Sequence, residues 1–146
     1  MSDSLPKQWL AKASEDLTVA RLVLKEDHSA HACFLSQQCI EKSLKAYLIA
    51  KANDYPHAHK LVDLLKKCEQ FDTAFSDFLS ECIVVDQYYI PTRYPDGVPG
   101  TAPGGTPSET EAKEAISAAE KILDFVTQKL ATDPSEADQK TPRSSS

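Results

Sequence analysis

Prolines stand at every fourth position from Pro91 to Pro107, and all four glycines of the chain lie in the same stretch, YYIPTRYPDGVPGTAPGGTPSETE. Each proline lacks a backbone N–H donor and each glycine adds backbone entropy, so neither a helix nor a central strand is expected here. The stretch must be a long connection, and long connections inside compact domains are usually functional or disordered. We expect order up to Asp96 and high mobility from Gly97 to Thr106.

Outside this segment, apolar residues recur every three or four positions, which is the period of an amphipathic helix. No stretch alternates between apolar and polar residues as a half-buried strand does. The pattern predicts an all-α protein: an up-and-down helical bundle of four to five helices, with the long Pro/Gly-rich loop before the last helix. The expected helices cover about residues 6–25, 29–53, 59–68, 72–89 and 109–130.

Residues at these boundaries match the signals that start and stop helices. Ser29 and Asp72 are suited to cap the second and fourth helices, because their side-chain oxygens can accept from free backbone N–H groups. Ser108 followed by Glu111 forms a capping box at the start of the last helix. Pro56 pushes the residue before it away from helical geometry, so it marks the break after the second helix.

The chain has 146 residues, of which 41% are hydrophobic and 26% charged, which suits one soluble domain with a buried core. We place the bundle in residues 1–131 and a polar tail, expected to be disordered, in residues 132–146. No apolar run could span a membrane and the N-terminus lacks signal-peptide features, so a cytoplasmic location is expected. The net charge of −6 argues against binding to duplex DNA.

Neither the cysteines nor the histidines have a spacing that favours a metal site. Reduced, core-type thiols among apolar neighbours are expected at Cys33, Cys39, Cys68 and Cys82. The histidines form two pairs without a carboxylate or thiolate at matching spacing, at His28 and His31 and at His57 and His59. We expect no metal and no other cofactor. His59 is expected to hydrogen-bond at the start of the third helix.

A polar strip lies on the second helix. Its members are three or four residues apart and therefore share one side of the helix: Gln38, Glu41, Lys42 and Lys45. Glu41 and Lys45 can form an i,i+4 ion pair with the acid nearer the N-terminus. One interpretation is a solvated face held by weak surface pairs. The other is a strip that lines a cleft or a dimer interface.

Arg93 stands near the start of the Pro/Gly-rich segment, where prolines on both sides stiffen the backbone. Tyr94 follows it directly and Asp96 is within reach of its side chain. A guanidinium presented in this way can bind a phosphate through two parallel N–H bonds. It can equally tie the loop to Asp96, and the residues alone leave both interpretations open.

Four stretches in this order resemble the HEPN domain family, over about Gln8 to Lys129: WLAKASEDLTVARLVL, ACFLSQQCIEKSLKAYL, HAHKLVDLL and YIPTRYPD. The resemblance implies a helical bundle that pairs as a homodimer. It also implies a partner, because many members are encoded beside a small nucleotidyltransferase as toxin–antitoxin or related two-component systems. Some members are metal-independent ribonucleases, and others bind nucleotides or act only as interaction modules.

The ribonuclease members depend on an arginine followed after four to six residues by a histidine, near the start of the last long helix. In this chain, Arg93 is followed at those positions by Val98, Pro99 and Gly100, and no histidine comes later. Arg21 and His28 have the right spacing but lie on the first helix and at its end, so that match is interpreted as chance.

The resemblance therefore implies a module that binds a nucleotide or an RNA end, or a nucleotidyltransferase partner, without cleaving RNA. The candidate contacts are Arg93, Asp96, Tyr94, Lys45, Lys42, Glu41, Gln38 and His59. A ribonuclease toxin that uses His59 or His57 as its base is the first alternative. A structural dimer that binds nothing is the second.

Overall fold

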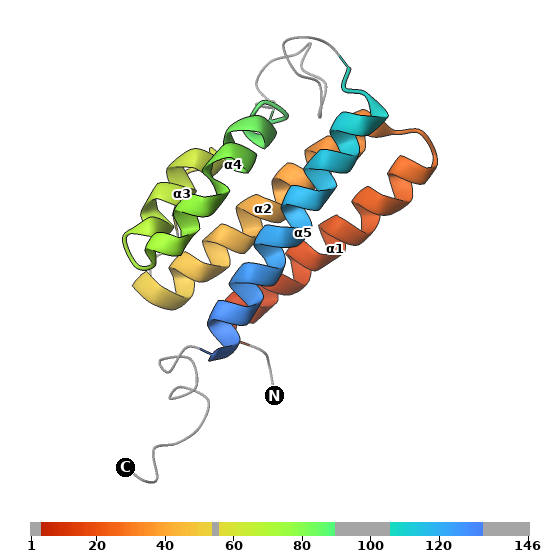
Figure 1. Cartoon of the computed structure of the whole chain (residues 1–146). Helices are drawn as coiled ribbons and strands as arrows, with labels where there is room; N and C mark the ends of the chain where they lie inside the picture. The colour runs from red at the N-terminus through yellow and green to blue at the C-terminus, as the bar shows by residue number, and fades with distance from the viewer. Residues whose placement is uncertain (1–3, 54–55, 90–105, 133–146) are drawn as a thin grey trace, which may run out of the picture.

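The computed structural model describes residues 4–53, 56–89 and 106–132, and within them it is a bundle of helices without a strand. The elements are α1 (Leu5–Lys25), α2 (Ser29–Ala52), α3 (Leu61–Glu69), the 3-10 helix η1 (Thr73–Phe78), α4 (Leu79–Asp86) and α5 (Glu109–Thr132). Figure 1 shows α1, α2 and α5 side by side as three long helices, with α3 and α4 as a shorter pair along α2. The predicted all-α, up-and-down bundle is confirmed.

The helix α2 is the centre of the bundle, because it contacts each of the other four α-helices. Every position from Ser36 to Ile49 except Gln38 and Lys42 is buried. The helix therefore has no broad polar face, and any charged side chain on it must find a partner inside the protein. The apolar residues that recur every three or four positions along the last helix are also buried: Ala112, Ile116, Ala119, Leu123, Val126 and Leu130.

The capping box of α5 is present as predicted. The backbone N–H of Ser108 donates to Glu111 Oε1 at 2.8 Å, and the N–H of Glu111 donates to Ser108 Oγ at 3.1 Å. Asp72 accepts from the Ala74 N–H at 3.0 Å, so it is a cap as expected, although η1 rather than an α-helix begins there. The Lys129 ammonium, followed by the Ala74 N–H, lowers the pKa of Asp72.

Two expected details of the second and third helices are wrong. His28, not Ser29, occupies the cap position of α2, and its side chain makes no capping bond. The third helix begins at Leu61 rather than at residue 59, and His59 does not cap it. The cap comes instead from the end of α4, where Asp86 accepts from the N–H of Leu61 at 2.7 Å and of Val62 at 3.1 Å. This carboxylate joins the start of α3 to the end of α4.

The four cysteines are free and buried in the core, as the sequence indicated. Burial raises the pKa of Cys33 to about 11 and that of Cys39 and Cys82 to about 12. Burial also raises the pKa of Cys68. These thiols stay protonated at neutral pH and act as small apolar side chains.

The second helix ends where Asn53 takes the left-handed conformation, with φ of 52°, and its N–H donates to the Ile49 carbonyl at 3.0 Å. The residue before Pro56, the segment predicted to be mobile except for Thr106, and almost all of the polar tail lie outside the described residues. None of the described helices is long and apolar enough to cross a membrane.

Removal of the Asp86 carboxylate should destabilise the protein. In Asp86→Ala two first-turn N–H groups of α3 lose their acceptor, and the free energy of unfolding should fall by about 1–2 kcal/mol. Asp86→Asn keeps one acceptor oxygen, so its free energy of unfolding should lie between those of Asp86→Ala and the wild type. Urea denaturation measures both, with Asp63→Ala as control, because Asp63 is an exposed residue in the first turn of the same helix. An Asp86→Ala variant as stable as this control would refute the role of the cap.

Candidate functional site

The polar strip predicted on the second helix lies largely inside the protein. Glu41 is 8% exposed and Lys45 is 4% exposed, so a solvated face is wrong for these two residues. Their ion pair is present, with 2.9 Å between Lys45 Nζ and Glu41 Oε2. A pair this deeply buried loses hydration on both ions and therefore needs further hydrogen bonds.

Glu41 receives these further bonds from two neighbours. The Nδ1 atom of His59 lies 3.1 Å from Glu41 Oε2, and Gln37 Nε2 donates to Glu41 Oε1 at 3.4 Å. Gln37 Nε2 also lies 3.4 Å from the His59 carbonyl oxygen, and its own oxygen accepts from Gln38 Nε2 at 2.7 Å. We call Glu41, Lys45, His59, Gln37 and Gln38 the Glu41 cluster. Of the predicted site residues, it brings together Gln38, Glu41, Lys45 and His59.

His59 reaches α2 because the chain returns along this helix after Asn53. Residues 56–60 precede α3 without regular structure, and His59 meets α2 about three turns before the helix ends. Its ring lies almost parallel to that of Tyr89, which follows α4, with 5.9 Å between centroids and 10° between planes. The sequence placed Tyr89 at the end of the expected fourth helix, residues 72–89, and gave no sign of this contact.

The bond to Glu41 determines which nitrogen of His59 carries the proton. An ionised carboxylate can only accept hydrogen bonds, so Nδ1 of His59 must be the donor. In the neutral ring the lone pair is then on Nε2. The His59 side chain is 56% exposed, so this site can accept a hydrogen bond or a proton from a bound molecule.

The positive charges of the strip are already neutralised by carboxylates. Lys42 binds Asp16 of α1 and so lies apart from the Glu41 cluster. Lys45, bonded to Glu41, also lies 6.0 Å from the ring centroid of Trp9 on α1. These lysines therefore join helices and do not present bare cations to a ligand. Gln37, which the sequence analysis did not single out, could have been found from its i,i+4 spacing to Glu41.

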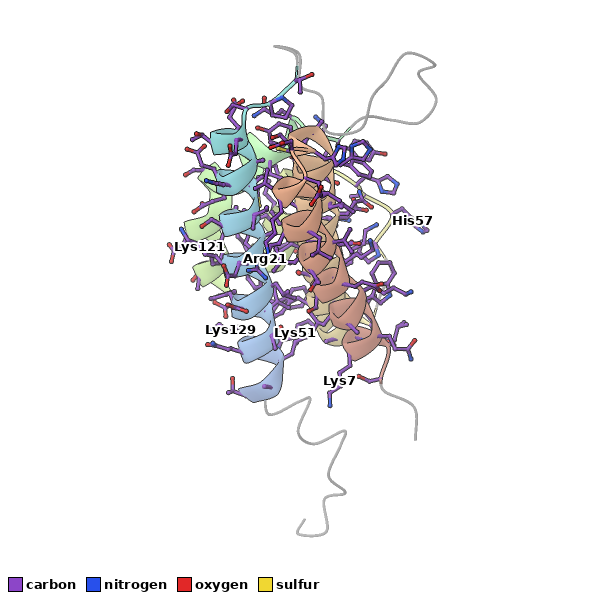
Figure 2. All side chains as sticks on the ribbon, turned by 90° about the vertical axis from the view of Figure 1, so that its right-hand side faces the viewer. Lys7, Arg21, Lys51, His57, Lys121 and Lys129 are labelled. Carbon is purple, nitrogen blue, oxygen red and sulfur yellow. The ribbon has the colours of Figure 1, made fainter. Side chains whose placement is uncertain are left out.

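The remaining predicted residues do not join the Glu41 cluster within the part of the chain described. Arg93, Tyr94 and Asp96 lie outside the described residues and stay predictions. Arg21 forms an ion pair with Glu120 of α5 at 3.2 Å, in an exposed position between the two helices (Figure 2). His57 points away from the bundle in the same view.

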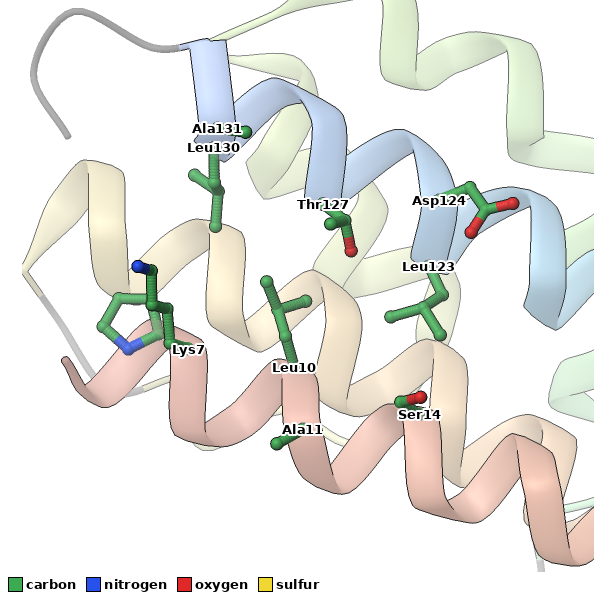
Figure 3. Close-up of a pocket in the computed structure, with 10 residues that line it drawn as sticks. Lys7, Leu10, Ala11, Ser14, Leu123, Asp124, Thr127, Leu130 and Ala131 are labelled. Carbon is green, nitrogen blue, oxygen red and sulfur yellow. The ribbon is translucent and has the colours of Figure 1, made fainter. Parts of the chain in front are cut away.

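A groove lies between the first turns of α1 and the last turns of α5, away from the junction of α1 with α2. It has a volume of about 540 Å³ and is lined by Pro6, Lys7, Leu10, Ala11, Ser14, Leu123, Asp124, Thr127, Leu130 and Ala131. Figure 3 shows Leu10 of α1 opposite Leu123 and Leu130 of α5. None of the predicted site residues lines this groove. Among the described residues no group of three or more His, Cys, Asp or Glu side chains is placed to hold a metal ion.

Burial of the Glu41–Lys45 pair should make it far more important for stability than an exposed pair of the same spacing. Glu41→Ala leaves the Lys45 ammonium buried without its carboxylate, which should lower the free energy of unfolding by about 3–5 kcal/mol. The matched control is Glu109→Ala, because Glu109 and Lys113 form an i,i+4 pair in which both side chains are at least 65% exposed. This control should cost about 0.5 kcal/mol or less. Equal losses in urea denaturation would contradict the account.

Comparisons with known proteins indicate a single protein family for this chain. The model of the family described as the HEPN domain matches residues 6–130. The curated protein "Putative toxin MJ1304" of Methanocaldococcus jannaschii is 26% identical over 130 residues, covering 82% of this chain and 84% of that protein. The crystal structure of TT1696 from Thermus thermophilus is 36% identical with a TM-score of 0.70, covering 85% of this chain and 97% of that one. ST0689, an archaeal HEPN homologue, is 30% identical with a TM-score of 0.67, covering 87% and 98%.

The matched residues include all of the described helices except the first residue of α1 and the last two of α5. The span agrees with the resemblance seen in the sequence between Gln8 and Lys129, which is thereby confirmed. The chain belongs to the HEPN domain family.

Proposed function

We propose that the protein is an HEPN-type nucleotide-binding and interaction module. In this proposal it works as a homodimer and as one half of a two-component system, with a small nucleotidyltransferase as the other half. Membership of the HEPN family supports the proposal. The similarity to the protein named "Putative toxin MJ1304" supports a place in a toxin–antitoxin or related pair.

The observation that carries the proposal is that no histidine follows Arg93 in the sequence. A guanidinium alone can hold a phosphate through charge-assisted N–H bonds. Cleavage of RNA additionally needs a group that removes a proton from the 2′-hydroxyl and returns one to the leaving oxygen. The motif of the ribonuclease members is incomplete here, so binding without turnover is the activity that the residues favour.

In this proposal the phosphate binds Arg93, with Tyr94 and Asp96 as its neighbours in sequence. The chain carries a net charge of −6, and both lysines of the predicted strip already bind carboxylates. The Glu41 cluster is suited instead to uncharged parts of a ligand.

Replacement of Arg93 should weaken nucleotide binding. Arg93→Ala removes a planar set of donors and should raise the Kd for ATP about tenfold or more, measured by isothermal titration calorimetry. Arg93→Lys keeps the positive charge but not the paired N–H donors, so its Kd for ATP should lie between those of the wild type and Arg93→Ala. Arg21→Ala, which removes an exposed guanidinium already paired with Glu120, is the control and should bind as the wild type does. Unchanged affinity in Arg93→Ala would refute the assignment.

The Glu41–His59 pair is the observation that favours a second candidate, a metal-independent ribonuclease in which His59 is the base. Incubation of the purified protein with single-stranded and structured RNA in the presence of EDTA distinguishes the ribonuclease from the binding module. We expect the RNA to stay intact over hours, because the arginine lacks its histidine. Cleavage that is abolished in His59→Ala and retained in His31→Ala would replace the binding proposal with the ribonuclease.

A further inference from the structure

His59 and Tyr89 are held next to each other by the junction of α3 and α4. His59 stands two residues before the start of α3, and Tyr89 stands three residues after the end of α4. The Asp86 carboxylate binds the first two N–H groups of α3 and so fixes these two chain segments against each other. The near-parallel rings stand on short segments next to the joined ends of α3 and α4, which gives a preorganised aromatic surface.

The ring of His59 is accessible although its partner carboxylate is not. More than half of the His59 side chain is exposed, whereas Tyr89 is partly buried and Glu41 is buried. An accessible ring that already lies on a second ring can stack with a flat ligand, and nucleobases stack on aromatic side chains whatever their sequence.

The hydrogen-bonding character of this surface is also fixed. Glu41 is held by Lys45 and Gln37, and it accepts from Nδ1 of His59, so Nε2 of the neutral ring is an acceptor. A ligand must therefore offer an N–H or O–H donor at this point. Because Lys45 is neutralised by Glu41 and Lys42 by Asp16, neither lysine of the polar strip presents an unpaired charge to a phosphate here.

We infer that the stacked rings of His59 and Tyr89, with the Glu41-oriented Nε2 as hydrogen-bond acceptor, bind the nucleoside part of the ligand. The inference rests on the proposed nucleotide-binding function and assigns the uncharged half of the ligand to described residues. The base stacks on His59, and a donor of the nucleoside, either a base amino group or a ribose hydroxyl, binds Nε2. The phosphates bind elsewhere.

Calorimetric titrations with adenosine and with inorganic pyrophosphate test the inference on the full chain. His59→Ala should weaken adenosine binding about tenfold or more, because it loses both the stacking surface and the acceptor. His59→Phe keeps a ring and loses only the acceptor, so its loss should be smaller. Tyr89→Ala removes the supporting ring without touching the bonds of Glu41, and it should also weaken adenosine binding. Pyrophosphate binding should be unchanged in all three.

Matched controls distinguish this inference from the function on which it rests. His31→Ala removes an exposed histidine near the start of α2 and should leave adenosine binding as in the wild type. Arg93→Ala should show the reverse pattern, with pyrophosphate binding weakened and adenosine binding retained. Weaker binding of 2′-deoxyadenosine would assign the donor to the ribose, and equal binding would assign it to the base.

Two results would overturn the inference. The first is adenosine binding that is undiminished in folded His59→Ala and Tyr89→Ala proteins while Arg93→Ala still loses pyrophosphate, which leaves the proposed function standing. The second is a wild-type protein that binds pyrophosphate but no adenosine at millimolar concentration. A protein that binds neither compound, nor ATP, would instead refute the proposed function itself. Circular dichroism and thermal melting show which variants are folded.

Discussion

A buried carboxylate on the central helix contacts side chains from its own helix and from the segment that precedes α3. Glu41 lies on α2, which every other α-helix contacts, and it can remain ionised there only if donors surround it. Lys45 supplies the opposite charge from the same helix, and Gln37 supplies a further donor. His59 comes from outside the helix, on residues 56–60, which lead into α3.

The same carboxylate links the interior to the surface. On its inner side it neutralises a lysine that lies beside α1, and on its outer side it orients an accessible imidazole. A buried ion pair is weak evidence for stability, because apolar residues of similar size often serve as well. An oriented imidazole, by contrast, needs an acceptor at Nδ1, and Glu41 provides it here. The geometry thus fits a Glu41 carboxylate that is retained because it orients His59 more than because it stabilises the fold.

Local features of the fold could be predicted from the sequence, and features that depend on distant contacts could not. The capping box of Ser108 and Glu111 and the apolar stripe of α5 are local patterns, and both are present. The pairing of Glu41 with Lys45 is also local, but its burial depends on α1 and on the returning chain. The cap of α3 comes from Asp86, 25 residues after the N–H group of Leu61 that it binds. Spacing along one helix cannot reveal such partners.

The single tryptophan of the chain has a place that gives it a use in solution. Trp9 lies on α1, and the Lys45 ammonium is 6.0 Å from the centre of its indole ring. Indole fluorescence responds to nearby charge. A change in the Glu41–Lys45 ion pair should therefore alter the wavelength or intensity of the Trp9 emission. Trp9 is thereby an intrinsic fluorescent probe, with which changes at the buried Glu41–Lys45 pair can be followed without an added dye.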